Sequence, residues 1–108
     1  MKKLDKYFRL RIPKKLIKDS STDFTDIVRI YRSPKIVNVF YLDNPRNQKT
    51  CMYECGEAVI DKRGRIFFDR ILQNRLDIYP NATYFSICLL DGKITFKTKL
   101  KMKGTTHG

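Results

Sequence analysis

Apolar and polar residues alternate over several short stretches of the chain, and this pattern predicts a domain made mostly of β-strands. The first stretch, 8–12, reads FRLRI, so its apolar residues, Phe8 among them, are expected to face inward. Arg9 and Arg11 then share the opposite, exposed face. The other expected strands are rich in β-branched and aromatic residues, and they cover 27–31, 35–42, 53–60, 65–68, 83–90 and 93–97.

Short amphipathic segments and turns separate the expected strands. Pro13 suits the first position of a helical turn over 14–18, because its missing N–H needs no partner there. A second helical turn is expected over 69–76, and Asp91-Gly92 is the strongest hairpin signal in the chain. Two segments lack such patterns, and they are expected to be a linker at 43–52 and a flexible basic tail at 100–108.

The order of expected elements occurs twice, at an offset of about 56 residues. Arg9 then lies opposite Arg65, and the neighbouring pairs agree in character: Leu10 with Ile66, Ile12 with Phe68, Lys14 with Arg70, and Leu16 with Leu72. Chance similarity between two basic β-segments is the alternative explanation. We predict a single domain, 1–108, built from two quasi-repeats at about 7–42 and 55–99.

The chain carries a formal net charge of +12, from 23 Lys and Arg against 11 Asp and Glu. The excess is spread over both halves, because residues 1–50 contribute +8 and residues 51–108 contribute +4. Such a surplus favours an anionic partner, above all nucleic acid, although lysines that only keep the protein soluble are the simpler alternative.

An apolar content of 42% is enough for a packed core. The aromatic residues of the expected strands could fill this core or stack on single-stranded nucleic acid. Because most of them lie in apolar runs, we predict core packing for Tyr31, Phe40, Tyr41, Phe67, Phe68, Tyr84 and Phe85. Cys88 lies in such a run as well and is expected to be a buried, small apolar residue.

Neither a metal site nor a catalytic site is expected. Cys51 and Cys55 lack a second pair of ligands, since the chain has one further cysteine and a single histidine, His107. No nucleophile or phosphate-binding motif occurs. A nuclease that uses Asp61 and Asp69 is the remaining enzymatic alternative, but it would need several converging acids to hold a metal. We therefore predict no enzyme and no cofactor.

No apolar run approaches the roughly 20 residues of a membrane span. The basic N-terminus also lacks the apolar region of a signal peptide. We therefore expect a cytoplasmic protein that binds no membrane.

Part of the chain resembles a known family, the AbrB-type swapped-hairpin DNA-binding domain. The resemblance rests on the turn Asp61-Lys62-Arg63-Gly64-Arg65-Ile66, on Leu72 and Leu76 of the helical turn, and on the hairpin Asp91-Gly92-Lys93-Ile94. It covers about 58–97 well and 7–42 weakly. Asp69 stands where the family has a proline, which Pro13 supplies in the first half, and Phe8 replaces the turn glycine.

The resemblance implies a double swapped-hairpin β-barrel. Its two quasi-repeats would form a pseudo-dimer within one chain or an exchanged homodimer between two chains. It also implies a bacterial, nucleoid-associated regulator of transcription that binds double-stranded DNA through arginines at the turns. An antitoxin-like or accessory protein-binding module and an RNA-binding β-module are the alternatives.

Basic side chains around the turns are the candidate DNA contacts. Gly64 allows a tight turn and close approach of the backbone to a phosphate, and Arg63 and Arg65 flank it. Arginine suits phosphates and guanine edges, because its planar fork donates two hydrogen bonds at once. The predicted DNA-binding set comprises Arg9, Arg11, Lys14, Lys15, Lys62, Arg63, Arg65, Arg70 and Arg75.

Overall fold

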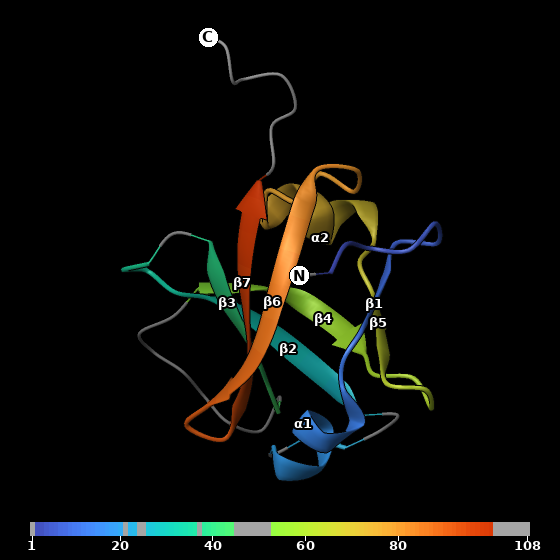
Figure 1. Cartoon of the computed structure of the whole chain (residues 1–108). Coiled ribbons are helices and arrows are strands. Elements are labelled where there is room, and N and C mark those ends of the chain that lie inside the picture. Colours follow the sequence, from blue (N-terminus) through green and yellow to red (C-terminus); the bar gives the residue numbers. More distant parts are fainter. Residues whose placement is uncertain (1, 21, 24–25, 37, 45–52, 101–108) are drawn as a thin grey trace, which may run out of the picture.

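The computed structural model describes residues 2–20, 22–23, 26–36, 38–44 and 53–100. The chain is mostly β with two short helices, as predicted. Its elements are β1 (Arg9–Arg11), α1 (Lys14–Asp19), β2 (Ile27–Arg32), β3 (Val39–Asp43), β4 (Tyr53–Val59), β5 (Arg65–Phe67), α2 (Arg70–Arg75), β6 (Thr83–Leu90) and β7 (Lys93–Leu100). Five strands form an antiparallel sheet in the order β4-β2-β3-β7-β6, and β1 pairs with β5 in a two-stranded ribbon. Figure 1 shows this ribbon beside the sheet. α1 lies near one end of the ribbon and α2 near the other.

Strand pairing relates the two halves of the chain by a pseudo-twofold arrangement. In the ribbon, Leu10 of β1 pairs with Ile66 of β5, and in the sheet Phe40 of β3 pairs with Phe96 of β7. Both pairs join residues that are 56 positions apart in the chain. When two equivalent residues pair across antiparallel strands, the twofold axis passes between them. The axis therefore passes between Leu10 and Ile66 in the ribbon and between Phe40 and Phe96 in the sheet. The two helices also begin 56 residues apart.

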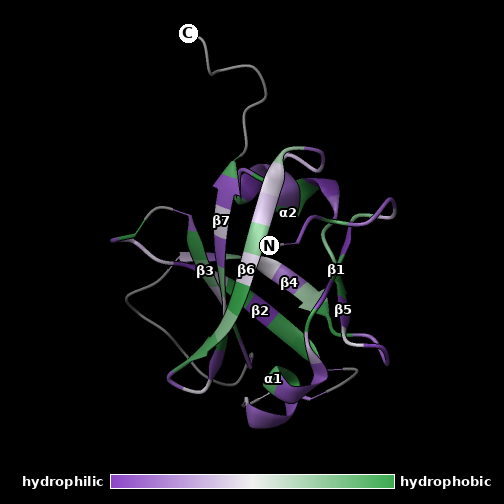
Figure 2. Cartoon of the chain, in the orientation of Figure 1, coloured by the Kyte–Doolittle hydropathy of each residue, from purple (hydrophilic) through white to green (hydrophobic). Residues whose placement is uncertain are grey.

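Four phenylalanine rings form the centre of the core. Phe40 and Phe96 stack with their ring centroids 4.9 Å apart. The ring centroids of Phe68 and Phe85 lie 6.3–6.5 Å from those of both, and all four contacts are edge to face. Since Phe40 belongs to the first half of the chain and the other three to the second, the halves share one core. Figure 2 shows hydrophobic and hydrophilic residues interleaved along the strands, as expected where one face of a strand covers the core and the other meets solvent.

Turn chemistry accounts for the two hairpins of the sheet. Asp91 and Gly92 both have positive φ, 52° and 76°, as a tight hairpin turn requires, and the predicted hairpin between β6 and β7 is confirmed. The connection between β2 and β3 is longer, since β2 ends at Arg32 and β3 begins at Val39, and within it the backbone N–H of Ile36 donates to Ser33 Oγ at 3.1 Å. The strand predicted over 35–42 therefore begins only at Val39, and the prediction is wrong at Ile36, which is exposed.

Three side chains predicted to be buried are exposed. Phe8 is 40% exposed, because it belongs to the turn before β1 and not to the strand. Phe67 is 52% exposed, since its neighbour Ile66 faces the core and successive residues of a strand face opposite sides. Cys88 is exposed on the edge strand β6. The rest of the predicted aromatic set is buried or half-buried: Tyr31, Phe40, Phe68 and Phe85, then Tyr41 and Tyr84.

The predicted linker and tail fall mostly outside the described residues. Asp43 is the last residue of β3 and is buried, and 45–52, with Cys51, lie outside. β7 continues to Leu100, three residues beyond its predicted end, and 101–108, with His107, lie outside as well. In the part of the chain that the structure describes, no helix is long and apolar enough to cross a membrane.

Candidate nucleic-acid interface

The β1–β5 ribbon presents arginines on its outer face. Leu10 and Ile66 face the core, so the residues on either side of each face outward. The register sets Arg11 of β1 directly opposite Arg65 of β5. Like charges directly opposite each other on one face of a strand pair are destabilising. An anion bound between the two guanidinium groups would remove this repulsion.

A carboxylate orients Arg65 from the turn before β5. Asp61 Oδ1 accepts the backbone N–H groups of Arg63 and Arg65, at 2.8 and 2.9 Å, and Oδ2 accepts Arg65 Nε at 2.8 Å. The Nε bond fixes the plane of the guanidinium and leaves its two terminal amino groups for a ligand. Those are the groups that donate two parallel hydrogen bonds to phosphate or guanine.

The same arrangement occurs 56 residues earlier. Asp5 Oδ1 accepts the backbone N–H groups of Tyr7 and Arg9, at 2.8 and 3.0 Å, and Oδ2 accepts Arg9 Nε at 3.1 Å. The guanidinium of Arg9 also lies over the ring of Tyr7, 4.8 Å from its centroid. Arg9 and Arg65 are thus held in equivalent ways at the two ends of the ribbon.

The turns themselves are tied to the opposite strands. Phe8 and Gly64 both have positive φ, 64° and 77°, although only Gly64 is free of the steric cost of that conformation. The N–H of Ile12 donates to Gly64 O at 2.7 Å, and the N–H of Phe68 donates to Phe8 O at 2.9 Å. These reciprocal bonds bring the start of α1 next to the Asp61–Gly64 turn, and the start of α2 next to the Asp5–Phe8 turn.

Hydrogen bonding holds the pKa of both turn carboxylates below the ordinary value. Partial burial alone would raise the pKa of Asp61, but the N–H and guanidinium groups of Arg65 and the N–H of Arg63 lower it by more. Partial burial alone would also raise the pKa of Asp5. The N–H groups of Arg9 and Tyr7 and the Arg9 side chain lower it by more. Both carboxylates are therefore ionised whenever the ribbon meets a ligand near neutral pH.

The lowered pKa values predict a stability that depends on pH. A carboxyl group with a folded pKa below its unfolded value stabilises the fold above the unfolded value, near 3.8, and this contribution is lost as the pH falls through the folded pKa. Melting temperatures measured from pH 6 to pH 2 should fall less steeply for Asp5→Asn/Asp61→Asn than for the parent. The control Asp91→Asn, at the β6–β7 turn, should follow the parent. A double variant that also follows the parent would contradict the prediction.

A basic hollow of about 430 Å³ lies beside the outer face of the ribbon. Its charged lining consists of five cations and the orienting carboxylate: Lys2, Lys3, Arg9, Arg11, Arg65 and Asp5. Sequence reasoning missed Lys2 and Lys3, because a basic N-terminus gives no signal of where it folds back. Reciprocal backbone hydrogen bonds between Lys2 and Phe85 of β6, at 3.0 and 2.6 Å, hold this segment in place.

Most other predicted residues lie at the two ends of the ribbon. Lys62 and Arg63 are exposed on the turn before β5, and Lys14 and Lys15 are exposed on the adjacent first turn of α1. Arg70 is exposed at the start of α2, at the opposite end.

Arg75 is separate from this interface. Its Nη1 donates to Cys55 O at 2.9 Å, and its side chain lines a hollow with Arg32 and Tyr53. Arg75 therefore connects α2 to β4 and is not brought together with the ribbon arginines.

The orienting residue Asp5 also escaped sequence reasoning. The comparison of the two halves begins near residue 8 and therefore omits the most similar residues, which lie just before it. Five residues upstream of Leu10 and Ile66 the chain reads Asp-Lys-x-x-Arg in both halves, as Asp5-Lys6-Tyr7-Phe8-Arg9 and as Asp61-Lys62-Arg63-Gly64-Arg65. Extending the alignment by three residues would have found it.

Among the described residues, no three His, Cys, Asp or Glu side chains gather in a way that could hold a metal ion. No family model matches this chain, and no curated protein or solved structure matches it either. The resemblance to the AbrB-type domain therefore rests on the motifs of the sequence.

Proposed function

We propose that this protein binds double-stranded DNA through the outer face of the β1–β5 ribbon. The observation that carries the proposal is the pair Arg11 and Arg65, which the strand register sets directly opposite each other. Arg9 adds a third guanidinium on the same face, and Lys2 and Lys3 line the adjacent hollow. Five cations around a single hollow provide the kind of surface that neutralises successive phosphates.

The dimensions of the ribbon suit the major groove of B-DNA. Three residues per strand at about 3.4 Å each give a ribbon roughly 10 Å long. The major groove is about 12 Å wide and admits a two-stranded β-ribbon. Basic residues at the ribbon ends would then reach the phosphates on either side of the groove: Lys6 and Arg70 at one end, Lys14, Lys15, Lys62 and Arg63 at the other.

We further propose that the chain forms an AbrB-like pseudo-dimer by itself and acts as a regulator of transcription. The pseudo-twofold pairing of β1 with β5 and of β3 with β7 supports the first part, because one chain supplies both halves of each pair. The regulatory role rests on the family resemblance of residues 58–97.

Arg11→Ala is the variant that tests the DNA surface with least disturbance. Its guanidinium has no side-chain partner among the described residues, so its removal leaves no acid unpaired. Affinity for a mixed-sequence 20-bp duplex should fall about tenfold at low salt, and the negative slope of log K against log salt should become shallower by about 0.9. The melting temperature should stay the same or rise slightly, since the repulsion with Arg65 is removed. Fluorescence anisotropy over a salt series and a thermal melt measure both.

Lys35→Ala serves as the charge-matched control, because Lys35 is exposed between β2 and β3, and this turn lies on the opposite side of the molecule from the ribbon (Figure 1). It should change duplex affinity less than twofold. If both variants lost the same amount of duplex affinity, the protein would be attracted to DNA by its net charge alone. Tighter binding to single-stranded RNA than to the duplex would favour the RNA-binding alternative. Light scattering of the complex should give one chain per occupied site if the pseudo-dimer is complete.

A further inference from the structure

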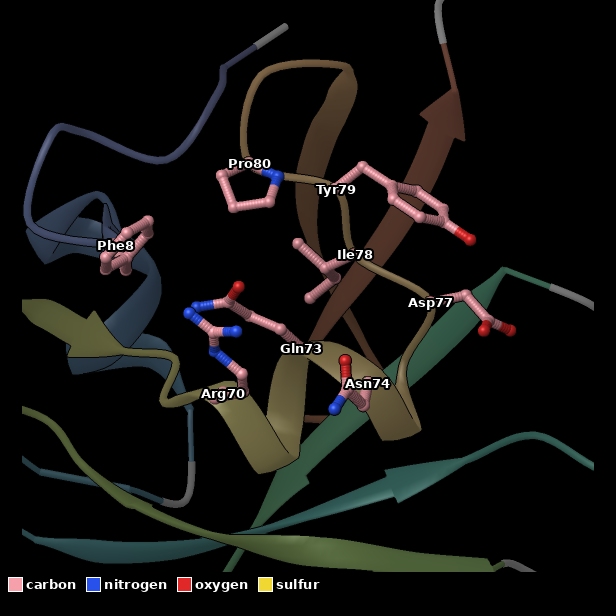
Figure 3. A pocket seen from close by; sticks show the side chains of 8 residues that line it. All are labelled: Phe8, Arg70, Gln73, Asn74, Asp77, Ile78, Tyr79 and Pro80. Atoms are coloured by element: carbon pink, nitrogen blue, oxygen red, sulfur yellow. The ribbon is translucent and has the colours of Figure 1, made fainter.

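One end of the ribbon adjoins a pocket whose lining shares only Arg70 with the proposed duplex contacts. It has a volume of about 390 Å³, and its lining includes Phe8, Arg70, Gln73, Asn74, Ile78 and Pro80. Figure 3 shows the ring of Phe8 on one side of the space and the side chains of Pro80 and Ile78 across from it. Arg70 and Gln73 reach in from α2, and the carboxylate of Asp77 points away from Phe8.

Phe8 occupies a backbone conformation that is costly for a bulky side chain. Its φ of 64° lies in the left-handed region, which favours glycine, and the equivalent residue of the other turn is indeed Gly64, with φ of 77°. The backbone therefore needs this conformation at both turns, but only one turn bears a ring there. Strained conformations of this kind cluster at functional sites, and here the ring forms a wall of the pocket.

The other half of the chain lacks the chemistry of this pocket. The residues 56 positions away are Gly64 for Phe8, Lys14 for Arg70, and then Ile17 and Lys18 for Gln73 and Asn74. An aromatic wall and two carboxamides are thus replaced by a glycine, an aliphatic residue and a lysine. The side chains that give this pocket its chemistry therefore occur at one end of the ribbon and not at the equivalent positions of the other.

We propose that this pocket takes a single unstacked nucleobase, with its phosphate on Arg70; the inference rests on the proposed DNA binding. Phe8 supplies the stacking face, and Ile78 and Pro80 close the opposite side. Gln73 Nε2 already donates to Phe68 O at 2.7 Å, which fixes the carboxamide and leaves Oε1 to accept from the edge of a base. Arg70 is exposed and brings the positive charge that a flanking phosphate requires.

The test compares two duplexes that differ by one base. One is fully paired, and the other carries one extra, unpaired adenine at its centre, so that a base is free to leave the stack at low cost. The parent should bind the second duplex about tenfold more tightly, which is the range of base–aromatic stacking. Phe8→Gly should abolish this preference but bind the paired duplex within twofold of the parent. Its melting temperature should equal or exceed that of the parent, because glycine suits the turn.

Arg70→Ala and Lys14→Ala form a matched pair of controls, since they remove equivalent charges at the two ends. Arg70→Ala should weaken binding of the bulged duplex more than of the paired one, and Lys14→Ala should weaken both equally. Equal binding of the two duplexes by the parent would overturn the pocket and leave the proposed function standing. A preference that persists in Phe8→Gly would also overturn it. If the parent bound neither duplex, the proposed function itself would be refuted.

A free nucleotide is the other source of the same chemistry. Adenosine monophosphate added to the bulged complex distinguishes the two sources. Competition at micromolar concentration that disappears in Phe8→Gly would support the pocket and identify a free nucleotide as its ligand. Competition that persists in Phe8→Gly would count against the pocket.

Discussion

Simultaneous replacement of Arg9 and Arg65 by alanine is expected to lower the affinity for duplex DNA about 100-fold at low salt. Each guanidinium is oriented through Nε by its own carboxylate, and among the described residues nothing accepts from its terminal amino groups. A hydrogen bond to a charged group contributes about 1.5–3 kcal/mol, so two such contacts account for roughly two orders of magnitude. The salt dependence should weaken by nearly two phosphate contacts. Anisotropy titrations with the mixed-sequence duplex measure both quantities.

Two companion variants separate charge, geometry and folding in this experiment. Lys97→Ala/Lys99→Ala removes the same two charges from β7 and should cost less than threefold in affinity. Replacing Arg9 and Arg65 by lysine keeps the charge but loses the planar fork, so the affinity should be intermediate. Both ion pairs are partly exposed, and such pairs contribute at most about 1 kcal/mol each to stability, so the protein should stay folded. Unchanged affinity of the alanine variant would show that the ribbon is not the DNA surface.

Local signals were sufficient to predict the elements that have strong local causes. Pro13 before α1 and Asp69 before α2 mark the helix starts, and Asp69 Oδ1 accepts the N–H of Leu72 at 2.8 Å as a helix N-cap. The Asp91-Gly92 turn fixed the second hairpin in the same way. In each case the residue that ends or starts an element acts within three or four positions of itself, so the sequence alone carries the information.

The errors arise where a distant contact decides the outcome. Phe8 fits the alternation of a strand, but the hydrogen bond from the N–H of Phe68 to its carbonyl holds it in a turn. Phe67 and Phe68 are adjacent aromatic residues, and only the orientation of Ile66 toward the core decides which one is buried. Lys2 reaches the ribbon because it pairs with Phe85, more than 80 residues away. No local pattern contains these contacts.

The arginines of the candidate site could be predicted from the sequence, whereas the residues around them, Lys2, Lys3 and Asp5, could not. Arg9, Arg11 and Arg65 follow from alternation and from the repeat, and their shared outer face follows from the register of β1 with β5. The two ends of the ribbon have the same backbone, yet one bears Arg63 and Gly64 where the other bears Tyr7 and Phe8. Two halves in one chain can diverge in this way, whereas identical chains in a homodimer cannot. The contrast suits a ligand whose two ends differ.

Phe68→Ala is expected to be among the most destabilising alanine substitutions in the chain. Phe68 is fully buried, and its ring lies 5.9–6.5 Å from the rings of Phe40, Phe85 and Phe96. Removal of a buried phenylalanine ring costs about 3–5 kcal/mol, through lost burial and the cavity that remains. That is a large share of the roughly 5–15 kcal/mol that stabilises a domain of this kind. Urea denaturation should show a much lower midpoint with an unchanged slope.

The adjacent variant Phe67→Ala supplies the control, because it removes the same ring from the next position of the chain. Phe67 lies on the exposed face of the ribbon, so its replacement should cost less than about 1 kcal/mol. Since Phe68 of the second half packs on Phe40 of the first, both variants should unfold in one cooperative transition. Two separate transitions in Phe68→Ala, or equal losses of stability in the two variants, would contradict a core that both halves share.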